Sequence, residues 1–157
     1  MKLLSDLIET SCKPIEILGL ASDSREVLPG YLFAAFDGND TSGLKFIPEA
    51  INRGAVAILS DKSILSNQYN THIITDKNPR LKFAKIVSRF YDKQPEWICA
   101  VTGTNGKTSV SSFTIQIWEK LKKKSSSIGT LGFGESKDML NLKSHLTTPD
   151  ALTLHKI

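Results

Sequence analysis

Apolar residues along this chain follow two patterns, one typical of buried strands and one typical of helices. Short continuous apolar runs at residues 31–36, 55–59 and 72–75 predict strands. Apolar residues three or four positions apart predict a short helix over residues 3–8. Pro48, suited to a first helical turn, and Gly54, suited to a C-terminal stop, predict another helix over residues 47–53. Because helical and extended segments alternate, the pattern predicts an α/β fold with mainly parallel strands.

The helix that follows residues 72–75 carries the most complete set of start signals. Asn78 is a suitable N-cap, and Pro79 suits the first helical position. The apolar stripe of this helix consists of Phe83, Ile86, Val87 and Phe90. The pattern breaks at residues 92–95, which end in proline, so we expect a hinge between two domains there.

A second set of elements is predicted after this hinge. Residues 97–101 predict a strand, a glycine-rich loop follows it, and residues 126–131 predict a further strand. A long helix is predicted between them, with an apolar stripe of Val110, Phe113, Ile117 and Leu121. The lysines at 122–124 close this helix, where cations complement the negative end of its dipole, so we do not interpret them as a nucleic-acid patch.

Composition excludes several classes of protein. The 157 residues are 40% hydrophobic and 23% charged, with a net charge of +4, which is typical of a globular chain rather than of disorder, collagen or a disulfide scaffold. No apolar run approaches the roughly 20 residues that span a bilayer, and Asp6 and Glu9 interrupt any signal peptide. Neither the cysteines, Cys12 and Cys99, nor the three histidines have metal-ligand spacing. We therefore expect a cytoplasmic protein without nucleic-acid or membrane partners.

The glycine-rich loop at residues 102–109 carries the clearest chemistry. Glycines between a strand and a helix let the backbone approach a polyphosphate, and the helix start favours negative charge. Lys107 would reach the β- and γ-phosphates, and the Thr108 hydroxyl would complete a Mg²⁺ shell. The predicted ATP-binding residues are Gly103, Thr104, Asn105, Gly106, Lys107, Thr108 and Ser109.

This loop departs from the general phosphate-binding pattern. Two residues rather than four separate Gly103 from the Gly-Lys pair, and Val101 occupies the usual position of the first glycine. The competing interpretation is an ordinary glycine-containing turn with an exposed lysine. The strand predicted before the loop and the helix predicted after it favour ATP binding.

Two polar loops in the first half are candidates for a ligand site. Asp23, Ser24 and Arg25 precede a turn, and residues 37–43 follow the predicted strand 31–36. Loops at the carboxyl ends of parallel strands bind ligands in such sheets, and small polar side chains suit a uracil or a diphosphate. Composition alone favours plain turn chemistry, because turns prefer these residue types.

The loop sequence TGTNGKTS resembles the shortened phosphate loop of the Mur ligase and folylpolyglutamate synthetase superfamily. Three blocks carry the resemblance over residues 22–150. The first is SDSREVLPGYLFAAFDGNDTSG with KFIPEAINRGAVAIL, the second runs from NPR and RFYDKQP into WICAVTGTNGKTS, and the third is SHLTTPD. Within the superfamily the chain is similar to the MurE-type ligases of peptidoglycan synthesis.

The resemblance implies a fold, an activity and site residues. It implies a Rossmann-like UDP-muramoyl-peptide-binding domain at residues 1–94 and the truncated first part of a central ATP-binding domain at residues 95–157. Such ligases use ATP and Mg²⁺ to add diaminopimelate or lysine to UDP-N-acetylmuramoyl-L-alanyl-D-glutamate through an acyl phosphate. The uridine nucleotide would be held by Ser24 and, in a loop that does not match residue for residue, by Asn39, Asp40 and Thr41. The muramoyl peptide would contact Thr147 and Thr148, and the metal would bind Thr108.

Most of the family's catalytic machinery lies in sequence beyond these motifs, so we expect an inactive N-terminal portion of the ligase. We also expect this portion to be a monomer. Two alternatives remain. One is the related ligase that adds D-alanyl-D-alanine to the UDP-N-acetylmuramoyl-tripeptide, and the other is a non-catalytic nucleotide-binding module.

Two local motifs have simpler interpretations. Thr148 and Pro149 read as the N-cap and first residue of a helix. Residues 76–80 look like the DNPR signature of diaminopimelate-adding members, but they precede the phosphate loop, contain an inserted lysine and read as a helix cap. They therefore say nothing about which amino acid is added.

Overall fold

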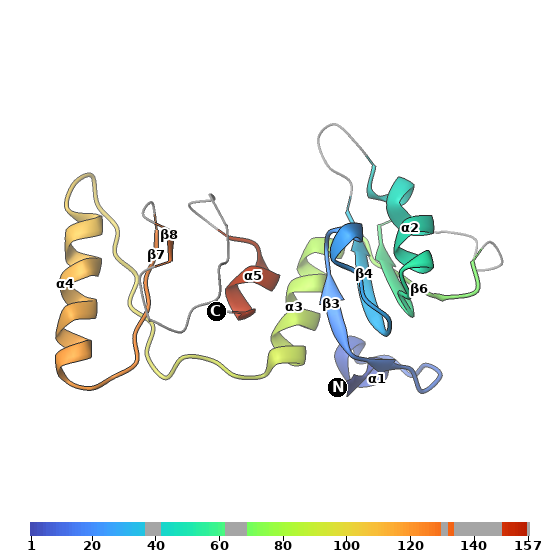
Figure 1. Ribbon diagram of the computed structural model, residues 1–157, viewed down its shortest axis with the longest axis horizontal. Coiled ribbons are helices and arrows are strands. Elements are labelled where there is room, and N and C mark those ends of the chain that lie inside the picture. Colours follow the sequence, from blue (N-terminus) through green and yellow to red (C-terminus); the bar gives the residue numbers. More distant parts are fainter. Residues whose placement is uncertain (37–41, 62–68, 130–131, 134–148, 157) are drawn as a thin grey trace. The chain divides into compact units, whose positions relative to one another are not determined.

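A computed structural model (Figure 1) describes residues 1–36, 42–61, 69–129, 132–133 and 149–156. The chain divides into two compact units, Met1–Lys93 and Gln94–His155. Each unit is described here by itself. None of the helices in the described part of the chain has the length and apolar character needed to cross a membrane.

The first unit is built on a four-stranded parallel sheet. Its strands are β3 (Gly19–Ala21), β4 (Tyr31–Ala35), β5 (Ala57–Ser60) and β6 (His72–Thr75), and they lie side by side in chain order. The register pairs Leu20 with Leu32, Leu32 with Ala57 and Ala57 with His72. The predicted α/β fold with parallel strands is therefore confirmed.

Alternate residues of β4 fill two different layers of the core. Phe33 and Ala35 belong to a buried cluster with Ile47 and Ala50 of α2 (Ile47–Asn52). Leu32 and Ala34 are also fully buried, and period-two alternation turns them toward the opposite face. Figure 1 shows α2 and α3 (Pro79–Tyr91) on opposite sides of this sheet, and α3 contacts β5. Burial on both faces explains why the strands read as continuous apolar runs.

Hydrogen bonds from side chains of α3 hold the amino-terminal segment against this helix. The short strands β1 (Lys2–Leu3) and β2 (Glu16–Ile17) pair antiparallel, and α1 (Leu4–Ile8) lies between them in sequence. Lys82 of α3 donates to the Ile8 carbonyl at 3.0 Å, and Arg89 donates to the Leu7 carbonyl at 2.8 Å. These cations satisfy the free carbonyls at the end of α1, where the helix dipole also favours positive charge.

Two glycines with positive φ join neighbouring turns of the first unit. Gly30 has φ +83° and Gly54 has φ +98°, and the Gly30 N–H donates to the Gly54 carbonyl at 2.9 Å. A Cβ on Gly54 would lie 2.7 Å from the Pro29 Cα. Gly54 ends α2, as the sequence predicts, and it also lets the chain pass close to the turn that enters β4.

The second unit differs from the sequence prediction in three places. One is the strand predicted at residues 126–131, of whose described residues only Ile128–Gly129 form a strand. The unit contains α4 (Lys107–Lys120), β7 (Ile128–Gly129) paired antiparallel with β8 (Gly132–Phe133), and α5 (Ala151–Lys156). The prediction of a strand at residues 97–101 is wrong, and Trp97 and Ile98 are 64% and 76% exposed there. A strand needs a hydrogen-bonding neighbour, and none of the strands that the structure describes pairs with these residues.

The start of the last helix is also corrected. The Asp150 side chain accepts from the Thr153 N–H at 2.8 Å, and the Asp150 carbonyl accepts from the Leu154 N–H at 2.9 Å. Asp150 is therefore the N-cap of α5, two residues after the predicted cap at Thr148, which lies outside the described residues. A carboxylate suits this position because it accepts the free N–H and complements the dipole.

Candidate functional site

The first candidate site lies at the carboxyl edge of the parallel sheet. β3 leads through Ser22 into a 3₁₀ turn over Ser24–Glu26, and its neighbour β4 leads to Phe36. Because the two strands are parallel, Ser24 and Phe36 lie at the same edge of the sheet. The predicted ligand residues Asn39, Asp40 and Thr41 lie outside the described residues, as do Thr147 and Thr148.

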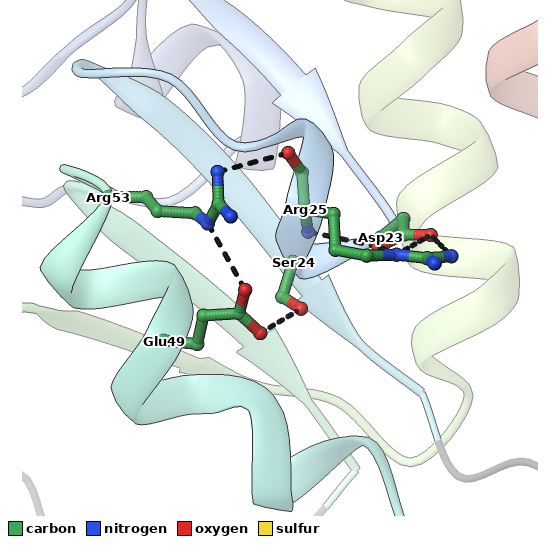
Figure 2. A network of polar contacts seen from close by, with 5 residues as sticks. All are labelled: Asp23, Ser24, Arg25, Glu49 and Arg53. Carbon is green, nitrogen blue, oxygen red and sulfur yellow. Dashed lines mark hydrogen bonds and ion pairs between the residues drawn. The ribbon is translucent and has the colours of Figure 1, made fainter.

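Ser24 joins this turn to α2 through a polar network (Figure 2). The Ser24 hydroxyl donates to Glu49 Oε2 at 2.7 Å, and Ser24 is only 5% exposed. The other carboxylate oxygen of Glu49 accepts from Arg53 Nε at 3.1 Å, and Arg53 Nη1 donates to the Arg25 carbonyl at 3.2 Å. A buried hydroxyl, a carboxylate and a guanidinium thus connect the turn to α2.

Asp23 caps the same turn and binds the Arg25 side chain. Its Oδ1 accepts from the Arg25 backbone N–H at 2.9 Å, and its Oδ2 accepts from Arg25 Nη2 at 2.6 Å. Figure 2 shows the Arg25 side chain lying back along Asp23 rather than reaching toward Glu49. The DSR motif is therefore ordered by its own side chains and by α2.

Charge and hydrogen bonding hold both carboxylates of the network ionised. The side-chain hydrogen bond from Arg25 lowers the pKa of Asp23 below its ordinary value. The hydrogen bond from Ser24, followed by those from Arg53, lowers the pKa of Glu49. At neutral pH both groups act as acceptors only, since an ionised carboxylate carries no proton.

Replacing Asp23 with asparagine is expected to reduce stability in a pH-dependent way. The folded-state pKa of Asp23 lies below its ordinary value of 3.8, so its contribution is complete above that value and is lost as the pH falls through the folded pKa. Urea unfolding should therefore separate wild type from Asp23→Asn at pH 7, and the difference should shrink below pH ~4. A difference that stays constant from pH 7 to pH 3 would mean that the charge of Asp23 contributes nothing.

Residues in the first turns of α3 contact Phe36, the residue that follows β4. The Phe36 ring meets the Phe83 ring edge-to-face at 5.5 Å, and the Arg80 guanidinium lies 4.8 Å from the Phe36 ring centre. Asn78 caps the helix by accepting from the Leu81 N–H at 3.2 Å, which confirms the predicted cap. The end of β4 is thus fixed by an aromatic pair and a cation.

The second candidate site is the loop that leads into α4. Gly103 has φ +148° and Gly106, the residue before the helix, has φ +78°. No side chain caps this helix start, and a Cβ built on Gly106 would meet no heavy atom within 4 Å. Open space and an uncapped helix start are what a polyphosphate requires.

Lys107 folds back over this loop. Its ammonium donates to the carbonyls of Gly103 and Thr104, the latter at 3.3 Å. The structure therefore brings Lys107 together with Gly103 and Thr104, and it places Thr108 and Ser109 in the first turn of α4, all of them exposed. The arrangement fits a phosphate group, because the exposed positive charge lies over the loop.

The apolar side of α4 is exposed in this structure. The four side chains that the sequence assigns to its apolar stripe are between 49% and 63% exposed: Val110, Phe113, Ile117 and Leu121. No group of three or more His, Cys, Asp or Glu side chains that could hold a metal ion occurs among the described residues.

Sequence reasoning missed Glu49 and Arg53. The two residues stand four apart on a predicted helix, which is the spacing of an ion pair, and their side chains meet at 3.1 Å. The spacing alone predicts a surface ion pair. Their link to Ser24 depends on how α2 packs against the turn, and the sequence pattern does not reveal it.

Both halves of the chain match models of the same protein family. Residues 16–100 match the family model described as "Mur ligase family, catalytic domain", and residues 101–157 match "Mur ligase middle domain". UDP-N-acetylmuramoyl-L-alanyl-D-glutamate–2,6-diaminopimelate ligases from Bradyrhizobium diazoefficiens and Brucella melitensis are 45% and 41% identical over 149 and 156 residues. These alignments cover 95% and 99% of this chain but only 30% and 31% of the relatives.

Solved structures show the same fold. A UDP-N-acetylmuramoyl-L-alanyl-D-glutamate–2,6-diaminopimelate ligase aligns with a TM-score of 0.69 at 23% identity, over 99% of this chain and 32% of that one. The MurF ligase of Thermotoga maritima in complex with ADP aligns with a TM-score of 0.54 at 25% identity, over 76% of this chain and 25% of that one. This chain thus spans about a third or less of each of these proteins.

Proposed function

The chain belongs to the Mur ligase family, and from this premise we propose that it forms part of an ATP-dependent ligase that adds diaminopimelate to UDP-N-acetylmuramoyl-L-alanyl-D-glutamate. The observation that carries this proposal is the 45% identity over 149 residues with a ligase of that name. Ligases of the same name from Brucella melitensis and Caulobacter vibrioides are 41% and 40% identical to this chain. Such a ligase acts in peptidoglycan synthesis.

The first unit would bind the UDP-muramoyl peptide. Ser24 lies at the carboxyl edge of a parallel sheet, which is where such sheets bind ligands. Phe36 lies at the same edge, and the predicted ligand residues Asn39, Asp40 and Thr41 follow it in the sequence. We assign the nucleotide end of the substrate to this edge and the muramoyl peptide to Thr147 and Thr148.

The second unit would bind ATP through the loop Gly103–Lys107. When bound, ATP supplies the phosphoryl group that activates a substrate carboxylate. Lys107 would balance the charge of the phosphates, and the Thr108 hydroxyl would contribute one oxygen to Mg²⁺. The open space at Gly106 and the position of Lys107 over the loop support this assignment.

We further propose that ligation needs the parts of the relatives that this chain does not match, since it spans about 30% of their length. The 157 residues alone would then bind nucleotides without forming an amide bond. ATP and UDP-activated precursors are cytoplasmic metabolites, so the proposal places the protein in the cytoplasm.

Calorimetric titration of the 157-residue chain tests this function. We expect saturable binding of UDP-N-acetylmuramoyl-L-alanyl-D-glutamate, weaker binding of the corresponding UDP-muramoyl-tripeptide, and binding of ATP. The same preparation should form no amide product with ATP and diaminopimelate.

Other outcomes would select the alternatives. Preference for the tripeptide nucleotide would indicate the ligase that adds D-alanyl-D-alanine. ATP binding without either sugar nucleotide would indicate a generic nucleotide-binding module. Turnover by the 157 residues alone would overturn the proposal that ligation needs further sequence.

A further inference from the structure

The hydroxyl of Ser24 has a fixed hydrogen-bond direction. A serine hydroxyl carries one proton, and in this structure that proton is donated to Glu49 Oε2 at 2.7 Å. Ser24 is 5% exposed, so water does not readily replace Glu49 as its partner. With its proton used, the Ser24 oxygen can only accept a further hydrogen bond.

Glu49 is held as an ionised carboxylate, so it can only accept the hydrogen bond from Ser24. Its second oxygen accepts from Arg53 Nε at 3.1 Å, and the charged groups that act on it are Arg53, Arg25 and Asp23. The hydrogen bonds from Ser24 and Arg53 lower the pKa of the Glu49 carboxyl, so it is ionised at neutral pH. An ionised carboxylate has no proton to return to Ser24.

We propose that Glu49 is a positioning residue that makes Ser24 a hydrogen-bond acceptor toward the ligand, so that the site selects a nucleobase with a donor at this position. This inference rests on the proposed function, in which Ser24 contacts the uridine nucleotide. The imide N3–H of uracil is such a donor. The N3 atom of cytosine is an acceptor, and it would face the Ser24 oxygen without a proton between them.

The expected discrimination follows from the cost of an unpaired polar group. A site built around a hydrogen bond rejects an analogue that lacks the matching group more strongly than an apolar pocket rejects an extra methylene. We expect the chain to bind UDP at least ~10-fold more tightly than CDP or 3-methyl-UDP, in which a methyl group replaces the imide proton.

Glu49→Gln is the direct test. The glutamine amide can donate to the Ser24 oxygen, which frees the hydroxyl proton to face the ligand. Titration with UDP, CDP and 3-methyl-UDP should then show the ~10-fold preference falling to within about threefold, with CDP gaining relative to UDP. Glu26→Gln, an exposed glutamate at the end of the same turn, is the matched control and should keep the wild-type preference.

Ser24→Ala provides a second, independent variant. It should also remove the preference for UDP, and Glu49→Gln should cause no further loss of preference in the Ser24→Ala background. Urea unfolding of each variant checks that the fold is retained. A purely structural role for Glu49 would weaken all three ligands by one common factor, and that result would overturn the inference.

Failure of this inference is distinguishable from failure of the proposed function. If the wild-type chain binds UDP and CDP equally, the inference is wrong while nucleotide binding stands. If the wild-type chain binds none of the three nucleotides, the proposed function of the first unit fails, and the inference fails with it.

Discussion

Replacing Lys107 with alanine is expected to weaken ATP binding by the chain about 100-fold or more. The Lys107 ammonium lies over the loop and donates to the carbonyls of Gly103 and Thr104. It therefore already lies beside the loop that would hold the phosphates. Charge-assisted hydrogen bonds contribute about 1.5–3 kcal/mol each, and the lysine would make two with the β- and γ-phosphates. Fluorescence titration with a labelled ATP analogue measures the change.

Lys120→Ala is the matched control for this substitution. Lys120 is an exposed lysine in the last turn of the same helix, so its removal changes the net charge equally. We expect the control to bind ATP within about twofold of wild type, since surface charges far from the phosphates are screened. If Lys107→Ala stayed within threefold of wild type, the loop would be an ordinary turn rather than a phosphate site.

Replacing Gly43 with alanine is expected to destabilise the first unit by about 3 kcal/mol. A Cβ on Gly43 would lie 2.2 Å from the Phe36 carbonyl oxygen and 2.7 Å from the Phe36 nitrogen. These atoms are backbone at the end of a central strand, so they cannot move aside as a side chain would. The 3₁₀ turn that begins at Gly43 would have to separate from β4, and α2 would be displaced with it.

Gly129→Ala is the control for that substitution, because a Cβ there meets no heavy atom within 4 Å. Urea unfolding should be followed by far-UV circular dichroism, since both tryptophans, Trp97 and Trp118, lie in the second unit. Equal midpoints for the two variants would contradict the close packing of Gly43 against Phe36.

Local signals explain which elements the sequence predicts well. The strand at residues 72–75 and the start of α3 agree with the structure residue for residue. β-branched residues favour the strand, and Asn78 followed by Pro79 defines the start of the helix. In these segments the residue types, the hydrophobic period and the tertiary packing favour the same conformation.

Elements that depend on distant partners were predicted poorly. β3 is three residues long and begins with Gly19, so no apolar run distinguishes it, and it exists because it pairs with β4. At residues 97–101 the error is the reverse, since a strand was predicted where none forms. An apolar run does not become a strand when no neighbouring strand pairs with it. Strand formation is decided by the neighbour as much as by the segment.

The candidate sites divide in the same way. The loop at residues 103–107 is local, so glycine spacing suffices to predict a turn before α4, where Gly103 and Gly106 have positive φ. Its phosphate chemistry stays a prediction. The hydrogen bond of the Ser24 hydroxyl goes to Glu49, 25 residues away, and only packing of α2 against the turn brings the two together. The family resemblance implies that Ser24 contacts the ligand, whereas only the structure shows that Glu49 accepts the hydrogen bond of its hydroxyl.

We propose that the carboxyl edge of the parallel sheet binds the uridine nucleotide of a UDP-muramoyl peptide. Mapping of amide chemical shifts during titration with UDP-N-acetylmuramoyl-L-alanyl-D-glutamate is the sharpest test of this site. We expect saturable shifts at residues 22–26, at Phe36 and at Gly43, with little change in α1. Absence of saturable shifts at millimolar ligand, or shifts concentrated away from this edge, would contradict it.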